Sequence, residues 1–185
     1  MFLQKIKNIT IIILCASFIT SCNQSISYKR PQILANFGSF QCETHKLAKV
    51  SYSNVWDKVR SGFCLDTVHS SRVDREIQWF QNNKSFLYRS IDRAKPFLYH
   101  VIVELEKNNL PFELALLPIV ESGYQPYAYS PSKAAGIWQF IPPTAREYGL
   151  KKNWWYDGRR DILASTKAAS HFLRDMKRHF KGDWL

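Results

Sequence analysis

One carboxylate, Glu121, follows an apolar stretch from Phe112 to Val120 in which Glu113 is the only charged residue. A helix that is apolar on nearly every face is a buried helix, and Gly123 is a natural stop for it. Glu121 then falls in the last turn, where burial and the negative end of the helix dipole both disfavour a charged carboxylate. A carboxylic acid that keeps its proton near neutral pH is suited to general acid catalysis.

We expect this buried helix to begin at Pro111, because the first helical position needs no N–H group. Pro118 removes one backbone hydrogen bond and is expected to kink or tighten the last turn. A competing interpretation makes Glu121 an ordinary, partly exposed residue near a helix end, paired with Lys133 or Arg146.

Groups that can bind a sugar follow directly after Glu121. Four aromatic residues are candidates for stacking on sugar faces, although residues of this type are more often part of a core: Tyr124, Tyr127, Tyr129 and Trp138. Ser130 precedes Pro131, which favours an extended backbone and could direct the hydroxyl into a cleft. Gln139 has donors and acceptors for a sugar amide or hydroxyl. The alternatives are a simple turn serine and a glutamine that bonds within the fold. The arrangement indicates a glycan-cleaving site.

The order of these residues resembles the lysozyme-like lytic transglycosylases, and in particular the membrane-bound lytic murein transglycosylase D group. The resemblance runs from about Val55 to Leu185. The residues that carry it are Val55–Phe63, Arg72–Asp74, Glu121-Ser122, Ser130-Pro131, Ala135–Phe140, Pro142, Thr144-Ala145 and Asn153–Asp161.

This resemblance implies a role for each matched position. Glu121 would be the single catalytic acid/base, and Ser130 and Gln139 would bind N-acetylmuramic acid around the scissile bond. Ser122 belongs to the signature, either as a further substrate-binding residue or in a structural role. The implied reaction is cleavage of the β-1,4 bond between N-acetylmuramic acid and N-acetylglucosamine, with formation of a 1,6-anhydro ring. No second catalytic acid is expected, because Asp157 and Asp161 have the pattern of cap and salt-bridge residues.

The family pattern continues with an Ala-Tyr-Asn motif, and LysM repeats are usual in this group. The sequence ends at Leu185, before that motif, so we expect the transglycosylase domain to be C-terminally truncated. The alternative function is therefore a catalytically inactive peptidoglycan-binding lipoprotein. A muramidase that hydrolyses the same bond is a third possibility.

The first residues have the form of an export signal. Lys5 and Lys7 precede an apolar segment, Ile9–Ile19, that is too short to span a bilayer. Ile19-Thr20-Ser21-Cys22 resembles a bacterial lipoprotein cleavage site, which would place a lipid on Cys22. The alternative is a plain signal peptide with an incidental cysteine. The following Asn23 favours a periplasmic protein anchored to the outer membrane.

Cys42 and Cys64 remain once the cysteines of the signal and the anchor are set aside. In an oxidising compartment they form either one disulfide or two thiols. No Cys or His spacing suggests a zinc site, and neither a metal nor a cofactor is expected.

The chain is basic, with 26 Lys and Arg against 15 Asp and Glu and a net charge of +11. An exported lipoprotein does not meet nucleic acid, so we expect the charge to suit wall-peptide carboxylates or anionic lipid. The expected partners are peptidoglycan glycan strands and, through Cys22, a membrane.

Helix signals dominate, and strand signals are few. Asn54 is expected to cap a helix that ends at Gly62, and Ser71 with Asp74 to cap the next. An apolar stripe at helical spacing consists of Phe97, Leu98, Val101, Ile102 and Leu105. Asp161 is expected to cap a last helix whose inward residues are Ala169, Phe172, Leu173, Met176 and Phe180.

These signals predict a mainly α protein with a lysozyme-like helical domain of the goose-type and soluble lytic transglycosylase kind. The predicted organisation is a lipoprotein signal peptide (1–21), a tether (22–50), a short N-terminal helical region (51–110) and an incomplete catalytic domain (111–185).

Overall fold

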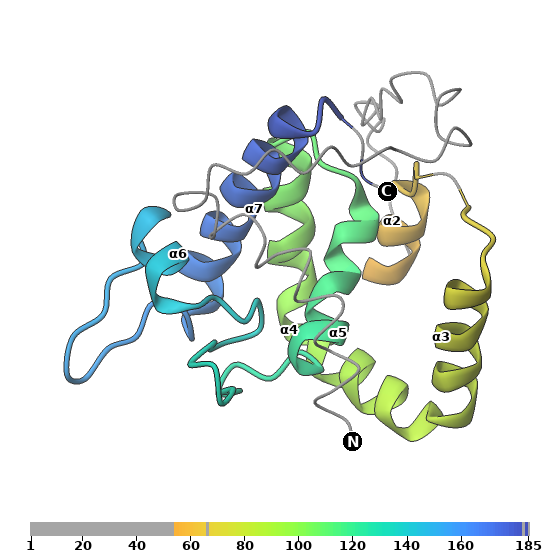
Figure 1. The fold of residues 1–185 in the computed structure, drawn as a ribbon, viewed down its shortest axis with the longest axis horizontal. Helices are drawn as coiled ribbons and strands as arrows, with labels where there is room; N and C mark the ends of the chain where they lie inside the picture. The colour runs from red at the N-terminus through yellow and green to blue at the C-terminus, as the bar shows by residue number, and fades with distance from the viewer. Residues whose placement is uncertain (1–53, 66, 183, 185) are drawn as a thin grey trace, which may run out of the picture. The chain divides into compact units, whose positions relative to one another are not determined.

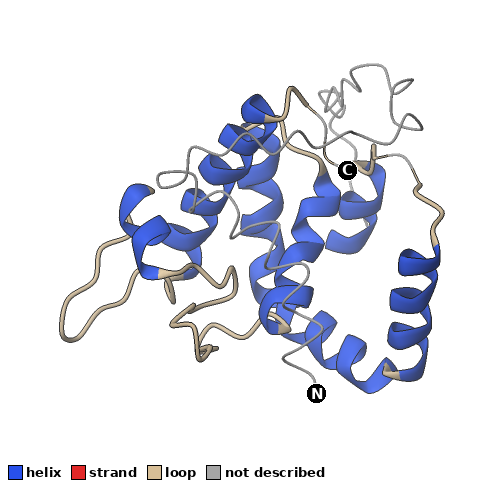
Figure 2. Ribbon diagram, in the orientation of Figure 1, coloured by secondary structure: helices blue, strands red, loops and turns tan. Residues whose placement is uncertain are grey.

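The computed structural model describes residues 54–65, 67–182 and 184, and the predicted signal peptide, tether, Cys22 and Cys42 lie outside them. The described helices are α2 (Val55–Ser61), α3 (Ser71–Asn82), α4 (Lys84–Lys107), the 3₁₀ helix η3 (Phe112–Leu116), α5 (Leu117–Ser122), α6 (Pro142–Glu147) and α7 (Ile162–His179) (Figure 1). Within the described residues these helices are joined by loops that form only isolated β-bridges (Figure 2). The mainly α prediction is confirmed.

The long helix α4 lies at the centre of the core. Its predicted apolar stripe is confirmed, with Leu98, Val101, Ile102 and Leu105 all buried and Phe97 half-buried. Helices α2, α3, η3, α5 and α7 all contact it, and η3 packs between α2 and α4 (Figure 1). Helix α4 is therefore the common packing partner of these five helices.

The helices before position 110 contribute to the same core as those after it. Asn54 caps α2 as predicted, because its side-chain oxygen accepts hydrogen bonds from the N–H groups of Trp56 and Asp57. At the other end of α2, a Cβ added to Gly62 would lie 2.1 Å from the ring of Phe112. The first helix thus packs directly on η3.

The cap of α3 differs from the prediction by one residue. Ser70, and not Ser71, is the N-cap, and its hydroxyl accepts a hydrogen bond from the N–H of Val73 at 3.2 Å. Two adjacent serines offer the same chemistry, so sequence alone does not choose between them.

The single helix expected from Pro111 to Ser122 is divided into η3 and α5. Pro118 has no N–H to donate to the carbonyl of Leu114, so the α-helical ladder cannot continue through it. Instead of kinking a continuous helix, Pro118 lies in the first turn of α5, where a missing N–H costs nothing.

Glu113 accepts hydrogen bonds from the backbone N–H groups of Cys64 and Leu65, at 2.5 and 2.7 Å.

Tyr124 belongs to the core, so the prediction that it could stack on a sugar is wrong. Its side chain is 0% exposed. Its hydroxyl donates a hydrogen bond of 2.6 Å to the carbonyl of Ala115. The left-handed backbone at Gly123 and Tyr124, with φ of 61° and 57°, turns the chain back onto η3 and buries the ring.

The last helix, α7, begins as predicted. The side chain of Asp161 accepts a hydrogen bond from the N–H of Ala164 at 2.9 Å. Ala168 and Ala169 are buried, but the prediction that Phe180 faces inward is wrong, because it is 54% exposed at the position that follows the end of the helix at His179.

Cys64 is disulfide-bonded, and its partner lies outside the described residues. This bond excludes the free-thiol alternative for Cys64. None of the helices in the described part of the chain is long and apolar enough to cross a membrane.

Candidate active site

Glu121 lies in the last turn of α5, as the sequence predicted. Gly123 ends the helix in the left-handed conformation, and the N–H groups of Gly123 and Tyr124 bond the carbonyls of Ile119 and Pro118, each at 3.0 Å. This C-terminal cap satisfies main-chain carbonyls that would otherwise be orphaned. The backbone that carries the carboxyl group is therefore fixed.

Burial raises the pKa of the Glu121 carboxyl from 4.5 to about 7, and no charged neighbour contributes to this shift. The carboxyl makes no ion pair with Lys133, Arg146 or any other described residue. The ion pair that the competing interpretation required is therefore absent. A carboxyl group that is half protonated near pH 7 can both give and take a proton.

Ser122, next to the acid, has a structural position. Its hydroxyl lies 3.0 Å from the carbonyl oxygen of Ile137 and 3.3 Å from that of Pro118. It also accepts a hydrogen bond from the N–H of Gln125. Ser122 thus links the end of α5 to the loop from Ala128 to Phe140, which we call the 128–140 loop.

The 128–140 loop contains three of the four predicted substrate-binding residues, Tyr129, Ser130 and Gln139, and is neither helix nor strand. Its main-chain hydrogen bonds join Ser130 to Ala134 at 2.9 Å and Ala135 to Phe140 at 3.1 Å. The indole N–H of Trp138 donates to the hydroxyl of Thr166 on α7 at 3.0 Å. The loop is thereby attached to the last helix.

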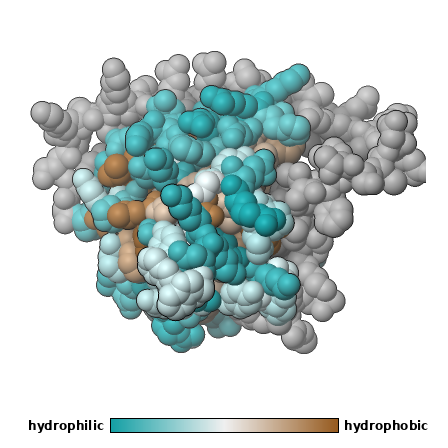
Figure 3. Space-filling model, turned by 90° about the vertical axis from the view of Figure 1, so that its left-hand side faces the viewer, coloured by the Kyte–Doolittle hydropathy of each residue, from teal (hydrophilic) through white to brown (hydrophobic). Residues whose placement is uncertain are grey.

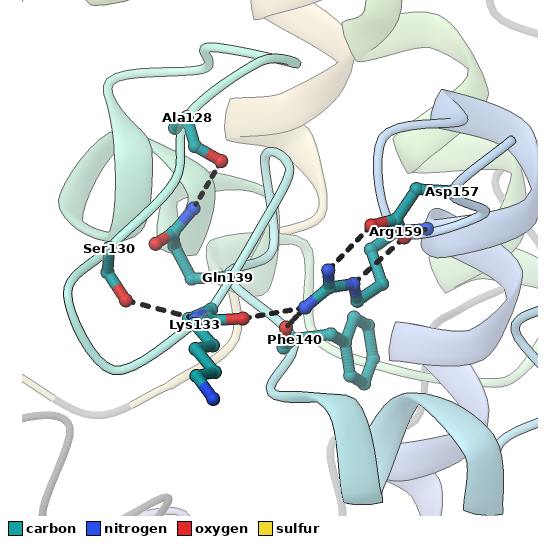
Figure 4. A network of polar contacts seen from close by, with 8 residues as sticks. Ala128, Ser130, Lys133, Gln139, Phe140, Asp157 and Arg159 are labelled. Atoms are coloured by element: carbon teal, nitrogen blue, oxygen red, sulfur yellow. Dashed lines mark hydrogen bonds and ion pairs between the residues drawn. The ribbon is translucent and has the colours of Figure 1, made fainter. Parts of the chain in front are cut away.

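Ser130 uses its hydroxyl within the loop. The oxygen accepts a hydrogen bond from the N–H of Ala134 at 3.0 Å and lies 2.9 Å from the hydroxyl of Ser132. Figure 4 shows Ser130 and Gln139 on the two arms of the loop. The geometry agrees with the alternative of a turn serine, and the O–H of Ser130 can donate to a ligand when Ser132 is the donor of the pair.

Gln139 is held by its amide nitrogen. The backbone is left-handed, with φ 49°. Nε2 donates to the carbonyl of Gly136 at 2.7 Å and to that of Ala128 at 3.4 Å, the second of which is drawn in Figure 4. Because both neighbours are acceptors, the amide nitrogen must face them. The oxygen Oε1 has no hydrogen bond to any described residue, so it is the atom that remains to accept one from a ligand.

The remaining stacking candidates divide into exposed and packed residues. Tyr127 and Tyr129 are 82% and 54% exposed, and the guanidinium of Arg160 lies 5.9 Å from the centroid of the Tyr129 ring. Trp138 is half-buried and packs against the core, so it is a structural residue. Tyr127 and Tyr129 keep a free surface on which a sugar could stack.

Two exposed residues of the segment Asn153–Asp161 were given no role of their own in the sequence analysis. Trp154 and Trp155 are 94% and 70% exposed in the turn that follows α6. The polar residues Lys151, Lys152 and Asn153 directly before them could have been used to predict an exposed turn. This face of the molecule is mostly hydrophilic, with scattered hydrophobic patches (Figure 3).

Arg159 was also missed, although it is the most buried charged side chain in the region, at 2% exposure. It forms an ion pair with Asp157, and its guanidinium also donates to the carbonyls of Lys133 and Phe140 (Figure 4). The predictions for the two nearby carboxylates are confirmed, because Asp157 is a salt-bridge partner and Asp161 is a helix cap.

Residues 101–185 match the family model described as "Transglycosylase SLT domain". This match confirms the resemblance noted in the sequence, and the mainly helical fold agrees with a lysozyme-like domain of this kind.

The chain is 42% identical over 132 residues to the membrane-bound lytic murein transglycosylase D of Escherichia coli strain K12. It has the same identity to the protein of that name from E. coli O6:H1 strain CFT073. These alignments cover 71% of this chain and 29% of each relative. A putative tributyltin chloride resistance protein of Alteromonas sp. strain M-1 is 46% identical over 92 residues, which are 50% of this chain and 44% of the relative.

The raised pKa of Glu121 predicts a pH-dependent stability that Glu121→Gln removes. The carboxyl is protonated in both folded and unfolded chains below pH 4.5, whereas between 4.5 and about 7 only the folded chain keeps the proton. Folding stability therefore falls as pH rises through this window, by about 3 kcal/mol. In urea denaturation, the stability of Glu121→Gln relative to the unsubstituted chain should rise by about this amount between pH 4 and pH 8. A difference that does not vary with pH would contradict the buried acid, and Glu76→Gln on α3 is the exposed control.

Gly136→Ala should destabilise the 128–140 loop strongly, because a Cβ at this position would lie 1.8 Å from the carbonyl oxygen of Arg159. Gly149→Ala is the matched control, since its φ of 77° resembles the 81° of Gly136 but nothing lies within 4 Å. Left-handed strain alone should cost the control about 1–2 kcal/mol. Gly136→Ala should cost about 2 kcal/mol more by thermal or urea unfolding. Equal losses would show that the close approach is unimportant.

Proposed function

We propose that this chain is a peptidoglycan lytic transglycosylase in which Glu121 is the single acid/base. The observation that carries the proposal is a carboxyl group whose pKa is raised to about 7 by burial alone, at the end of a capped helix. The domain match and the name of the E. coli relatives, lytic murein transglycosylase, support the reaction class.

The reaction would use the same carboxyl group twice. Protonated Glu121 donates its proton to the oxygen that bridges N-acetylmuramic acid and N-acetylglucosamine, and the bond from that oxygen to the anomeric carbon breaks. The carboxylate then removes the proton of the C6 hydroxyl, whose oxygen bonds to the anomeric carbon. The product is a 1,6-anhydro ring, and Glu121 is again protonated.

A pKa near 7 suits both halves of this cycle. At a lower pKa the acid would be ionised before the substrate bound, and at a higher one the carboxylate would be slow to form. No second carboxylate is required, because the nucleophile is a hydroxyl of the substrate itself, held close to the reacting carbon.

Substrate binding would involve groups of the 128–140 loop, which Ser122 links to the end of α5. Gln139 would accept a hydrogen bond from a sugar hydroxyl or acetamido N–H through Oε1, and Tyr129 would pack on a sugar face. Ser130 would contribute by donating its O–H to the sugar, with Ser132 as the donor within the serine pair. No metal or other cofactor enters this scheme.

The proposed reaction has a direct test in Glu121→Gln, which keeps the shape of the side chain and removes its proton. Digests of peptidoglycan sacculi analysed by mass spectrometry should contain 1,6-anhydro-muropeptides with the unsubstituted chain and with Glu76→Gln. Glu121→Gln should lower their release by at least about 10²–10⁴-fold. With the unsubstituted chain, release should fall as pH rises through about 7, because the acid loses its proton.

Each other outcome of that experiment contradicts part of the proposal. Undiminished anhydro products from Glu121→Gln would remove Glu121 as the acid. Reducing-end sugars would show a hydrolase, and an unsubstituted chain that binds sacculi without releasing anything would show the non-catalytic binding protein.

For location, we propose a periplasmic protein anchored by lipid at Cys22, with the outer membrane as the favoured membrane. The basis is the sequence Ile19-Thr20-Ser21-Cys22 followed by Asn23, supported by the membrane-bound character in the relatives' name. In cells supplied with labelled palmitate, the chain should incorporate label and Cys22→Ser should not. Equal labelling of both would rule out this anchor.

A further inference from the structure

The 128–140 loop needs an external support, because two of its residues have a backbone conformation that is unfavourable for side chains other than glycine. Lys133 has φ 65° and Gln139 has φ 49°. Such residues persist only where the surrounding structure holds them. These two residues are the first and last of the segment 133–139, which contains Gly136.

Arg159 bonds this segment at both ends. Its Nη1 donates to the carbonyl of Lys133 at 2.6 Å and to the carbonyl of Phe140, the residue after Gln139, at 3.2 Å (Figure 4). The main chain of Arg159 meets the middle of the segment, because its carbonyl oxygen occupies the space beside Gly136. One residue therefore touches the loop at three places.

Asp157 fixes the guanidinium that makes these bonds. Its two carboxylate oxygens accept from Nε at 2.9 Å and from Nη2 at 2.5 Å, which leaves Nη1 for the loop carbonyls. This bidentate geometry is specific to arginine, since a lysine ammonium cannot present the same planar set of donors. The hydrogen bond from Arg159 also lowers the pKa of Asp157, so the pair stays charged.

We propose that Arg159, oriented by Asp157, is a positioning residue for glycan binding: it holds Lys133 and Phe140 so that the amide of Gln139 faces Gly136 and Ala128 and offers Oε1 to the sugar. The inference rests on the proposed function for the identity of the ligand. Arg159 itself has 2% of its surface exposed and does not contact the ligand.

The test is a double-mutant cycle between Arg159→Lys and Gln139→Ala, measured with soluble murein glycan strands. Arg159→Lys should raise KM about 10- to 100-fold while changing kcat little, because a displaced binding group loses its contact with the ligand. In the Gln139→Ala background the same substitution should change KM by less than about twofold, since the group it positions is already gone. In Arg159→Lys, the pH at which the rate declines should stay near 7, because Arg159 does not contribute to the pKa of Glu121.

The control is a matched pair on the surface. Arg60 and Asp57 form an exposed ion pair of 2.8 Å in α2. Arg60→Lys should leave KM unchanged in both backgrounds. Equal KM effects of Arg159→Lys with and without Gln139, or no effect in either, would overturn the proposal.

A readout that does not depend on cleavage separates this inference from the proposed reaction. In ¹⁵N NMR spectra the side-chain NH₂ of Gln139 should exchange slowly with water, and Arg159→Lys should remove this protection while Arg60→Lys does not. Lost protection in a chain that never cleaves murein would reject the reaction and keep the positioning role. Retained protection would reject the role. If Arg159→Lys does not fold, Asp157→Asn, which keeps the shape of its side chain, takes its place with the same expected result.

Discussion

The burial of the Glu121 carboxyl depends on a helix that has almost no stability of its own. Helix α5 has six residues, far fewer than an isolated helix needs in water. It is held because Pro118 and Ile119 are buried and because η3 and α4 pack against it. The acidity of the site is therefore a property of the whole core, and any change that lets water reach α5 would return the pKa of Glu121 toward 4.5.

The part of the site beside the acid is held in a different way. The 128–140 loop has little regular structure, and polar contacts from separate elements fix it: Ser122 from α5, Thr166 from α7, and Arg159 from the turn before α7. A buried ion pair such as Arg159–Asp157 contributes little net stability, whereas loss of one partner costs about 3–5 kcal/mol. Its value here is that it specifies one arrangement of a loop that could otherwise take several.

Sequence periodicity and cap residues predicted the helical framework because both are local signals. The stripe from Leu98 to Leu105, the caps Asn54 and Asp161, and the place of Glu121 before Gly123 all follow from neighbouring residues. The division of the helix expected from Pro111 could have been inferred from the missing N–H of Pro118. The apolar pattern before Pro118, however, fits a 3₁₀ helix as well as an α-helix, so the helix type of η3 was not predictable.

What the sequence did not predict depends on contacts between distant segments. Tyr124 was open to either a sugar-stacking or a core position, and only the turn at Gly123 shows that it folds back onto Ala115. Arg159 donates hydrogen bonds to main-chain carbonyls 19 and 26 residues away. Every residue has such a carbonyl, so the sequence does not indicate which of them will accept a bond. For the same reason the hydrogen bonds of Ser130 and Gln139 were left as alternatives.

Helix α3 has no fully buried side chain, in contrast to α4, against which it packs. Trp79 makes edge-to-face contacts with Phe80 and Phe86, at 5.1 and 5.5 Å between ring centroids. These rings form a cluster where α3 meets α4. Elements with little buried apolar surface open at lower free energy than the rest of a domain. Partial unfolding would therefore begin at α3, while α2, which packs on η3, and α5, which carries the acid, stay folded.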